Sequence, residues 1–480
     1  MTTLDRTAVD RFVADTWTGE LVPALQHYIT IPALSPAFDP AWEANGHLER
    51  AVEHIRSWMA ARPLAGMAVS VHRLPGRTPV IVADVPAFGP GAAAAPGSPS
   101  VLLYGHLDKQ PEMEGWRDGL GPWTPVLDGE LLYGRGGADD GYAAYASLTA
   151  LEAIQRNGGS HARCVVLIEA SEESGSPDLP AHVEALAGQL GPVDLVICLD
   201  SGSASYDTLW LTSSLRGMAA GTLHVSVLTE GVHSGSASGV VPSSFRIIRQ
   251  LLDRVEDAAT GAVLLDEANV EIPPYRRAEA EAMADALGQG AGVGYPFLPG
   301  VEPMVPPGAE ALLARTWRPA LSYIGADGLP PSGRAGNVLR PFTGLTLSLR
   351  LPPTADPDAA QAALAARLTA DPPSGATVRF DHGGSAPGWN APDLDPWLRD
   401  ALDRASIDTF GTPVQLMGEG GTIPFMGMLG ERFPGAQFVV AGVLGPGSNA
   451  HGPNEFLHLG YARRLTSIIT RVLDAHTGAP

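Results

Sequence analysis

The chain has 480 residues, of which 45% are hydrophobic and 17% charged, a composition typical of a folded protein large enough for two or more domains. Its 52 acidic residues outnumber its 31 basic residues, which gives a formal net charge of −21. This charge argues against nucleic acid and anionic membrane surfaces as partners, because both attract basic proteins.

The first residues lack the basic and apolar regions of a secretory signal, and no run of about 18 apolar residues would span a membrane. Cys164 and Cys198 each lie in an apolar run, which is typical of reduced cysteines in a protein core. We therefore expect a cytoplasmic protein that does not contact a membrane.

The first 200 residues alternate between two hydrophobic patterns. Apolar residues at helical spacing predict helices over 4–30 and 47–61, after Asp140, and near 179–190. The apolar runs that predict strands are 69–73, 79–85, 101–108, 164–170 and 193–200. Strands that alternate with helices predict an α/β fold with a mostly parallel sheet.

The pattern changes after residue 213. Residues 216–228 alternate like a strand with one exposed face, and 258–335 are rich in Pro and Gly and look irregular. The remaining predicted elements of this region are a helix at 242–257, a strand at 345–351, a helix at 356–369 and a strand at 376–381. A helix at 394–410 and a strand at 437–443 then resume the first pattern. We expect an inserted α+β domain (214–385) within a first domain formed by 1–213 and 386–480.

Three of the predicted strands run into acids or histidine. The first is followed by His106 and Asp108, the second by Glu172 and Glu173, and the third by Asp200. In an open α/β sheet, ligands bind beyond the carboxyl ends of the strands, so these side chains should lie close together. One His-x-Asp pair by itself is also compatible with an ordinary hydrogen bond.

Two further segments carry candidate ligands. A glycine-rich turn ends in Asp139 and Asp140, and His451 lies in a Gly/Pro-rich stretch near the C-terminus. The turn lacks the spacing of a dinucleotide-binding loop and is compatible with an ordinary turn. Nitrogen and oxygen donors without thiolates suit zinc, manganese or cobalt.

Six motifs together resemble the M20 metallopeptidases, close to the carnosinase-like cytosolic dipeptidases. They are GHLDKQP, GRGGADDG, EASEESGS, ICLDSG, VHSG and NAHGPNE, and they occur in the order of that family. The resemblance implies a zinc-peptidase-like catalytic domain and an inserted, ferredoxin-like α+β domain that serves as lid and dimerisation module. It also implies a homodimer and two divalent ions per subunit, zinc first, with manganese or cobalt as alternatives.

The resemblance implies roles for individual residues of the catalytic domain. His106 and Asp200 would hold one ion, Glu173 and His451 the other, and Asp139 would bridge both. Asp108 would support His106. Glu172 would be the general base that takes a proton from water. A cis peptide bond between Asp139 and Asp140 is also implied.

The resemblance assigns substrate contacts to the inserted domain and to one loop. His233 would stabilise the oxyanion in the active site of the other subunit, and Arg350 would clamp a substrate carboxylate. The other implied substrate contacts are Asn337, Gly420, Gly421 and Thr422. Many relatives have a lysine directly after the Asp pair, where this chain has Gly141. We interpret Lys109, the only lysine of the chain, as a rim residue or a local charge.

The expected activity is hydrolysis of the amide bond of dipeptides or similar small peptides. One alternative within the same chemistry is an N-acyl-amino-acid amidase or deacylase. Another alternative is a metal-binding module without catalysis, although an intact Glu172 argues against that interpretation.

Overall fold

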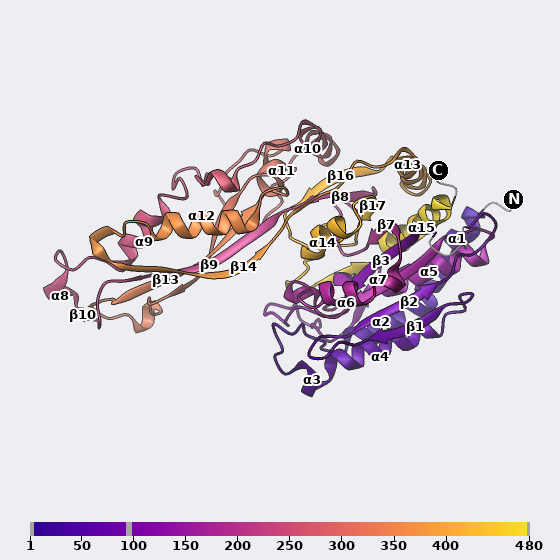
Figure 1. Cartoon of the computed structure of the whole chain (residues 1–480), viewed down its shortest axis with the longest axis horizontal. Helices are drawn as coiled ribbons and strands as arrows, with labels where there is room; N and C mark the ends of the chain where they lie inside the picture. Colours follow the sequence, from indigo (N-terminus) through magenta and orange to yellow (C-terminus); the bar gives the residue numbers. More distant parts are fainter. Residues whose placement is uncertain (1–3, 93–97, 478–480) are drawn as a thin grey trace. The chain divides into compact units, whose positions relative to one another are not determined.

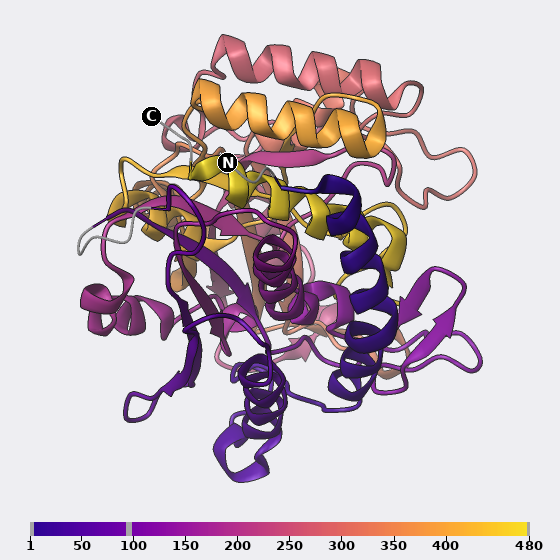
Figure 2. The ribbon, with the colours of Figure 1, turned by 90° about the vertical axis from the view of Figure 1, so that its right-hand side faces the viewer.

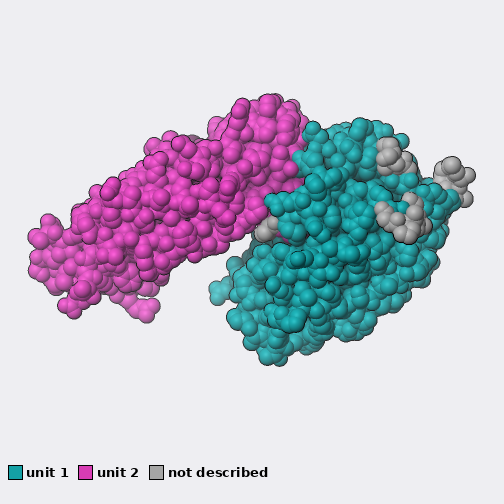
Figure 3. Space-filling model, in the orientation of Figure 1, with its two compact units in different colours: residues 1–212, 391–416, 428–480 teal, residues 213–390, 417–427 magenta. Residues whose placement is uncertain are grey.

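The computed structural model describes residues 4–92 and 98–477 and divides the chain into two compact units (Figure 3). Unit 1 comprises Met1–Thr212, Ala391–Leu416 and Met428–Pro480, and unit 2 comprises Ser213–Asn390 and Met417–Gly427. The segment Met417–Gly427 was expected in the first domain, as part of 386–480, but belongs to unit 2.

In the described part of the chain, six strands form the main sheet of unit 1, in the order β1-β2-β6-β3-β7-β17 (Figure 1). Their bounds are β1 Ala68–His72, β2 Val80–Val85, β6 Arg163–Glu169, β3 Ser100–His106, β7 Val193–Cys198 and β17 Gln437–Val440. The four strands from β6 to β17 are parallel, whereas β2 runs antiparallel to β6 and to β1. The predicted mostly parallel sheet is confirmed, and the carboxyl ends of β6, β3 and β7 meet at one edge.

Helices cover this sheet. Figure 2 shows the N-terminal segment in indigo as one continuous rod, which consists of α1 (Arg6–Thr16), a π-helical turn (Trp17–Leu21) and α2 (Val22–Ile29). The other long helices are α4 (His47–Ala60), α5 (Tyr142–Arg156), α13 (Pro396–Phe410) and α15 (Leu459–His476). Helix α15 packs against α1, α5 and α13, so the two ends of the chain share one core.

The smaller elements of unit 1 include a sheet in the order β18-β5-β4. In it β18 (Phe456–His458) pairs with β5 (Leu131–Tyr133), which pairs with β4 (Val126–Asp128). The short helices are α3 (Trp42–Asn45), α6 (Leu179–Ala185) and α7 (Ala187–Leu190). Because β18 follows His451 and β5 precedes the glycine-rich turn, this sheet brings the two ligand-bearing loops together.

Among the described residues, four antiparallel strands form the sheet of unit 2, in the order β11-β13-β9-β14. The strands are β9 (Gly217–Ser226), β11 (Ala320–Asp327), β13 (Phe342–Leu351) and β14 (Thr377–Ala386). Helices α9 (Ser244–Leu252) and α12 (Pro357–Thr369) pack on this sheet. If the further elements inserted between β9 and β13 are left aside, the chain order is β9-α9-β11-β13-α12-β14, which with this strand order is the ferredoxin-like arrangement.

The prediction that 258–335 is irregular is wrong. This stretch contains α10 (Pro274–Leu287), α11 (Ala309–Thr316) and the edge strand β11. Helix α10 is rich in alanine and buries few large side chains, so its apolar pattern is weak in the sequence. The remaining elements are β8 (Trp210–Leu215), β10 (Val232–His233), α8 (Ser234–Ala237), β12 (Val338–Leu339), β15 (Trp389–Asn390), β16 (Gln415–Glu419) and α14 (Pro424–Arg432).

Candidate metal centre

The strand ends of unit 1 deliver the candidate ligands to one place. His106 is the last residue of β3, and Asp200 lies two residues beyond β7. Glu172 and Glu173 begin a 3₁₀ turn just beyond β6. Since β3 pairs in parallel with both β6 and β7, these side chains emerge at the same edge of the sheet.

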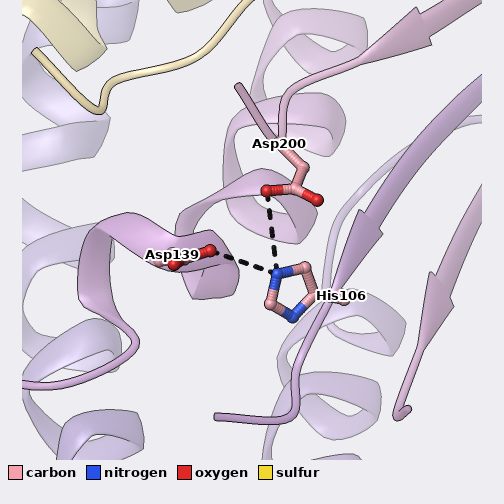
Figure 4. A group of neighbouring side chains, drawn as sticks. All are labelled: His106, Asp139 and Asp200. Atoms are coloured by element: carbon pink, nitrogen blue, oxygen red, sulfur yellow. Dashed lines mark hydrogen bonds and ion pairs between the residues drawn. The ribbon is translucent and has the colours of Figure 1, made fainter. Parts of the chain in front are cut away.

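His106, Asp139 and Asp200 form the first group of candidate ligands. The His106 Nε2 atom lies 3.3 Å from Asp139 Oδ1 and 3.7 Å from Asp200 Oδ1. Figure 4 shows both carboxylates turned toward the imidazole nitrogen. All three residues are buried, so one nitrogen and two oxygen donors converge in a place shielded from water.

Asp139 also belongs to a second group, with Glu173 and His451. The His451 Nε2 atom lies 3.0 Å from Asp139 Oδ2 and 3.3 Å from Glu173 Oε2. The amide of Gln110, which the sequence interpretation missed, donates to Glu173 Oε2 at 2.6 Å. Asp139 thus presents one oxygen to each group, and the peptide bond that follows it is cis.

Asp108 contacts residues of both groups of candidate ligands and fixes their positions. Its carboxylate accepts hydrogen bonds from the backbone N–H of Glu172 (3.1 Å) and Glu173 (3.0 Å). Its backbone carbonyl lies 3.1 Å from His106 Nδ1, and its Oδ1 lies 3.5 Å from the same nitrogen. These contacts fix the imidazole orientation and leave Nε2 directed at the two carboxylates, as in histidines that bind metals.

The electrostatics of the cluster favour a bound cation. Burial opposes ionisation of Asp139, but hydrogen bonds from His106 and His451 outweigh it and hold the pKa of Asp139 below its usual value. Burial and the charge of Asp139 raise the pKa of Glu173 to about 8. Carboxylates crowded together without water repel one another, and a divalent cation relieves this repulsion.

Glu172 belongs to neither group, although it lies next to Glu173. Burial, followed by the negative charge of Asp200, raises its pKa well above the usual value. A carboxyl group in this position is not occupied as a ligand and has an increased proton affinity, which is what a general base that later donates its proton requires.

A buried ion pair joins the two ligand-bearing loops. The Arg135 guanidinium donates to the carboxylate of Glu455 and, through Nη2, to the carbonyl of Gly452 at 2.8 Å. Glu455 Oε1 also accepts the backbone N–H of Gly136 at 2.8 Å. Both charged side chains are almost completely buried. The GRGG and PNE motifs contain these residues, but the sequence did not reveal that they pair.

The interpretation of Lys109 as a rim residue is wrong. Its side chain is completely buried. The ammonium donates to the carbonyls of Tyr28 (2.9 Å) and Ile31 (2.8 Å) at the C-terminus of α2, and lies 3.9 Å from the centre of the Tyr28 ring. Lys109 is therefore a structural residue whose amino group binds the loop after β3 to the end of α2, and burial lowers its pKa well below the usual value.

The predicted substrate contacts lie in unit 2, at two separate places. Arg350 in β13 donates to Thr422 Oγ1 at 3.0 Å, close to Gly420 and Gly421. Strand β10, which contains His233, pairs with β12, and Ser234 N–H donates to the Asn337 carbonyl at 2.9 Å. Figure 1 shows β10 and β16 at opposite ends of this unit. The structure therefore groups His233 with Asn337, and Arg350 with residues 420–422.

An α/β sheet with histidines and carboxylates gathered at its strand ends is typical of metal-dependent hydrolases. More particularly, the chain belongs to peptidase family M20/M25/M40, whose sequence profile matches residues 102–475. It is thus an M20-type metallopeptidase with a candidate metal centre. None of the helices in the described ranges is long and apolar enough to cross a membrane.

Three known proteins illustrate the relationship. Cysteinylglycine-S-conjugate dipeptidase from Corynebacterium striatum is 29% identical over 75% of this chain and 77% of its own length. Mouse β-Ala-His dipeptidase is 28% identical over 57% of this chain and 56% of its own length. The structure of the dipeptidase Dug1p from Saccharomyces cerevisiae covers 99% of both chains with a TM-score of 0.79 at 21% identity, which shows the shared fold.

Proposed function

We propose that this protein is a dipeptidase that uses two divalent metal ions, zinc first, to hydrolyse the amide bond of small peptides. The observation that carries the proposal is the pair of ligand groups that share Asp139. The printed names of the relatives from Corynebacterium striatum and mouse, both dipeptidases, support the substrate class.

The donor set fits two ions. His106 and Asp200 would hold one and Glu173 and His451 the other, with one oxygen of Asp139 toward each. Imidazole and carboxylate donors without thiolates suit zinc, manganese and cobalt. When bound, the ions supply Lewis-acid activation of water and of the scissile carbonyl.

Glu172 carries the proton in this proposal. It takes a proton from the attacking water and delivers it to the amine that leaves. Asp108 fixes the backbone of Glu172 and so directs this side chain.

Unit 2 would recognise the substrate. Arg350, Thr422 and the backbone of Gly420 and Gly421 would bind the C-terminal carboxylate, because a guanidinium binds a carboxylate through two parallel hydrogen bonds. His233 and Asn337 would complete the active site of a second subunit. The side chain of His233 is exposed, and its Nδ1 accepts the Gly235 N–H at 3.1 Å, so its Nε2 is the nitrogen left to donate to an oxyanion.

A homodimer would use the exposed face of unit 2. The edge strand β11 bears Tyr323 and Ile324, which are 47% and 65% exposed, and Val240 after α8 is 85% exposed. Large apolar side chains on an open sheet edge are typical of an interface. A cytoplasmic location agrees with the two free, buried cysteines.

Two measurements test the function. The purified protein should contain close to two metal ions per chain and should hydrolyse dipeptides that have a free amino group, with activity lost on chelation and restored by zinc or manganese. N-acetyl amino acids in the same panel test for a deacylase. Metal content without hydrolysis of any of these compounds would contradict the proposal and favour a binding module.

Glu172→Gln tests the mechanism. We expect turnover to fall at least about 100-fold while metal content stays unchanged, because the positioned base is lost and the ligands remain. Glu184→Gln makes the same change in charge at an exposed position of α6 and should leave turnover as it is. Near-normal turnover of a folded, metal-loaded Glu172→Gln variant would refute the assigned role.

A further inference from the structure

Three arginines surround the loop of residues 420–422 in unit 2. Arg216 lies between β8 and β9, Arg315 in α11 and Arg350 in β13. Arg216 Nε donates to the Gly420 carbonyl at 3.2 Å, and Arg350 Nη1 donates to Thr422 Oγ1 at 3.0 Å. A Cβ atom at Gly420 would lie 3.4 Å from Arg216 Nη2 and 3.0 Å from the carbonyl oxygen of Arg315. We call these three residues the arginine cluster.

The arginine cluster carries an excess of positive charge. Among the described residues, no carboxylate oxygen forms an ion pair with any of the three guanidinium groups. Burial, followed by the positive charges of Arg350 and Arg315, lowers the pKa of Arg216 to about 10. Glu419 interacts with the positive charge of Arg315, but burial raises the pKa of Glu419. Even an ionised Glu419 offsets only one of the three charges.

Arg216 and Arg350 use few of their N–H groups in hydrogen bonds within the chain. Arg216 uses one of its five N–H groups on the Gly420 carbonyl, and Arg350 uses one on Thr422. The other N–H groups of these two side chains make no hydrogen bond within the part of the chain that the structure describes. Partly buried guanidinium groups with unused donors are suited to bidentate binding of carboxylates.

We propose that the arginine cluster binds a second carboxylate, so that the enzyme prefers dipeptides whose C-terminal residue has an acidic side chain. This inference rests on the proposed function. Arg350 takes the α-carboxylate of the substrate, and Arg216, together with Arg315, takes the side-chain carboxylate. The three arginines and an ionised Glu419 together have a net charge of +2. One substrate carboxylate reduces this net charge to +1, and two carboxylates neutralise it.

The test compares Ala-Glu with Ala-Gln at neutral pH. The two substrates have nearly the same shape and differ in one charge. We expect wild-type kcat/KM to be at least about 10-fold higher for Ala-Glu, the usual gain from a charge-assisted contact that the amide cannot make. In Arg216→Gln this ratio should fall close to 1, because the guanidinium that distinguishes the two substrates is lost.

The matched control is Arg379→Gln, which removes the same charge from an exposed position on β14. Its ratio should equal that of the wild type. Arg216→Lys, which keeps the charge and loses the planar fork, should give an intermediate ratio and replaces Arg216→Gln if that variant does not fold.

Each outcome has a distinct meaning. A wild-type ratio near 1 overturns the inference and leaves the dipeptidase function in place, because both substrates are still hydrolysed. An Arg216→Gln ratio equal to the wild-type ratio also overturns it. If the metal-loaded wild type hydrolyses no dipeptide, the proposed function fails, and the inference that rests on it fails as well.

Discussion

The buried ion pair between Arg135 and Glu455 allows a prediction about stability. Glu455→Gln keeps the shape of the side chain and its hydrogen bond from Gly136 N–H, but leaves the Arg135 guanidinium buried without a counter-charge. Breaking a buried pair from one side costs about 3–5 kcal/mol, and the retained hydrogen bond places this variant near the lower value. At about 2 °C per kcal/mol for a unit of this size, the Tm should fall by about 6 °C.

Replacement of Arg135, the other member of the ion pair, should lower the stability of the protein less than Glu455→Gln does. Burial raises the pKa of Glu455 to about 7 even with Arg135 present. In Arg135→Met the carboxyl group can therefore take up a proton and lose its charge at neutral pH, whereas a guanidinium cannot lose its proton. We expect Glu455→Gln to destabilise the protein more than Arg135→Met at pH 8, where the wild-type Glu455 is ionised, and the double variant to cost less than the sum of the two.

Thermal denaturation of the chelated protein, followed by calorimetry, measures these differences. The control is Glu130→Gln, which breaks an exposed ion pair with Arg463 and should cost about 0–1 kcal/mol. Zinc affinity should fall in Glu455→Gln but not in the Glu130→Gln control, because Asp139 and His451 lie on the two loops that the buried pair joins. A Glu455→Gln variant with the Tm and zinc affinity of the Glu130→Gln control would refute this explanation.

Three further predictions concern the same region. Asp108→Asn should weaken zinc binding about 10–100-fold, measured by competition with a chelator, because the carboxylate that orients the ligands loses its charge; unchanged affinity would contradict this role. In the chelated protein, burial raises the pKa of Glu169 to about 7 and that of Glu173 to about 8. The folded chain therefore holds more protons than the unfolded chain, so its Tm should fall as the pH rises from about 4.5 to 8. A Tm that rises over this pH range would contradict the raised pKa values of Glu169 and Glu173. Finally, Lys109→Arg should lower the stability by about 1–3 kcal/mol, because the Lys109 stem packs against Gly136 and leaves no room for a guanidinium; an unchanged Tm would show that the site can expand.

The sequence was sufficient to predict where the candidate ligands gather. Apolar runs mark β3, β6 and β7 without knowledge of the tertiary structure, and the geometry of parallel sheets then places His106, Glu173 and Asp200 at one edge. Local patterns carry this information, because a buried strand reveals itself by its own residues. The parallel core and the α+β character of the inserted region were predicted for the same reason.

What the sequence could not predict depends on contacts between distant segments. Lys109 stands beside the ligands in the sequence, but only the packing of α2 against the loop after β3 shows that its ammonium binds carbonyls. The pairing of Arg135 with Glu455 spans 320 positions of the chain. Helix α15 is different: Leu465, Ile468, Ile469 and Val472 have helical spacing and lie in the core, so its signal was present and was missed.

The complete burial of Lys109 has a practical consequence for labelling. It is the only lysine in these 480 residues, so the folded protein exposes no ε-amino group to acylating or cross-linking reagents. Amine-reactive dyes would reach this side chain only after the contact between α2 and the loop after β3 opens. The rate at which Lys109 acquires a label would therefore report how often that contact opens.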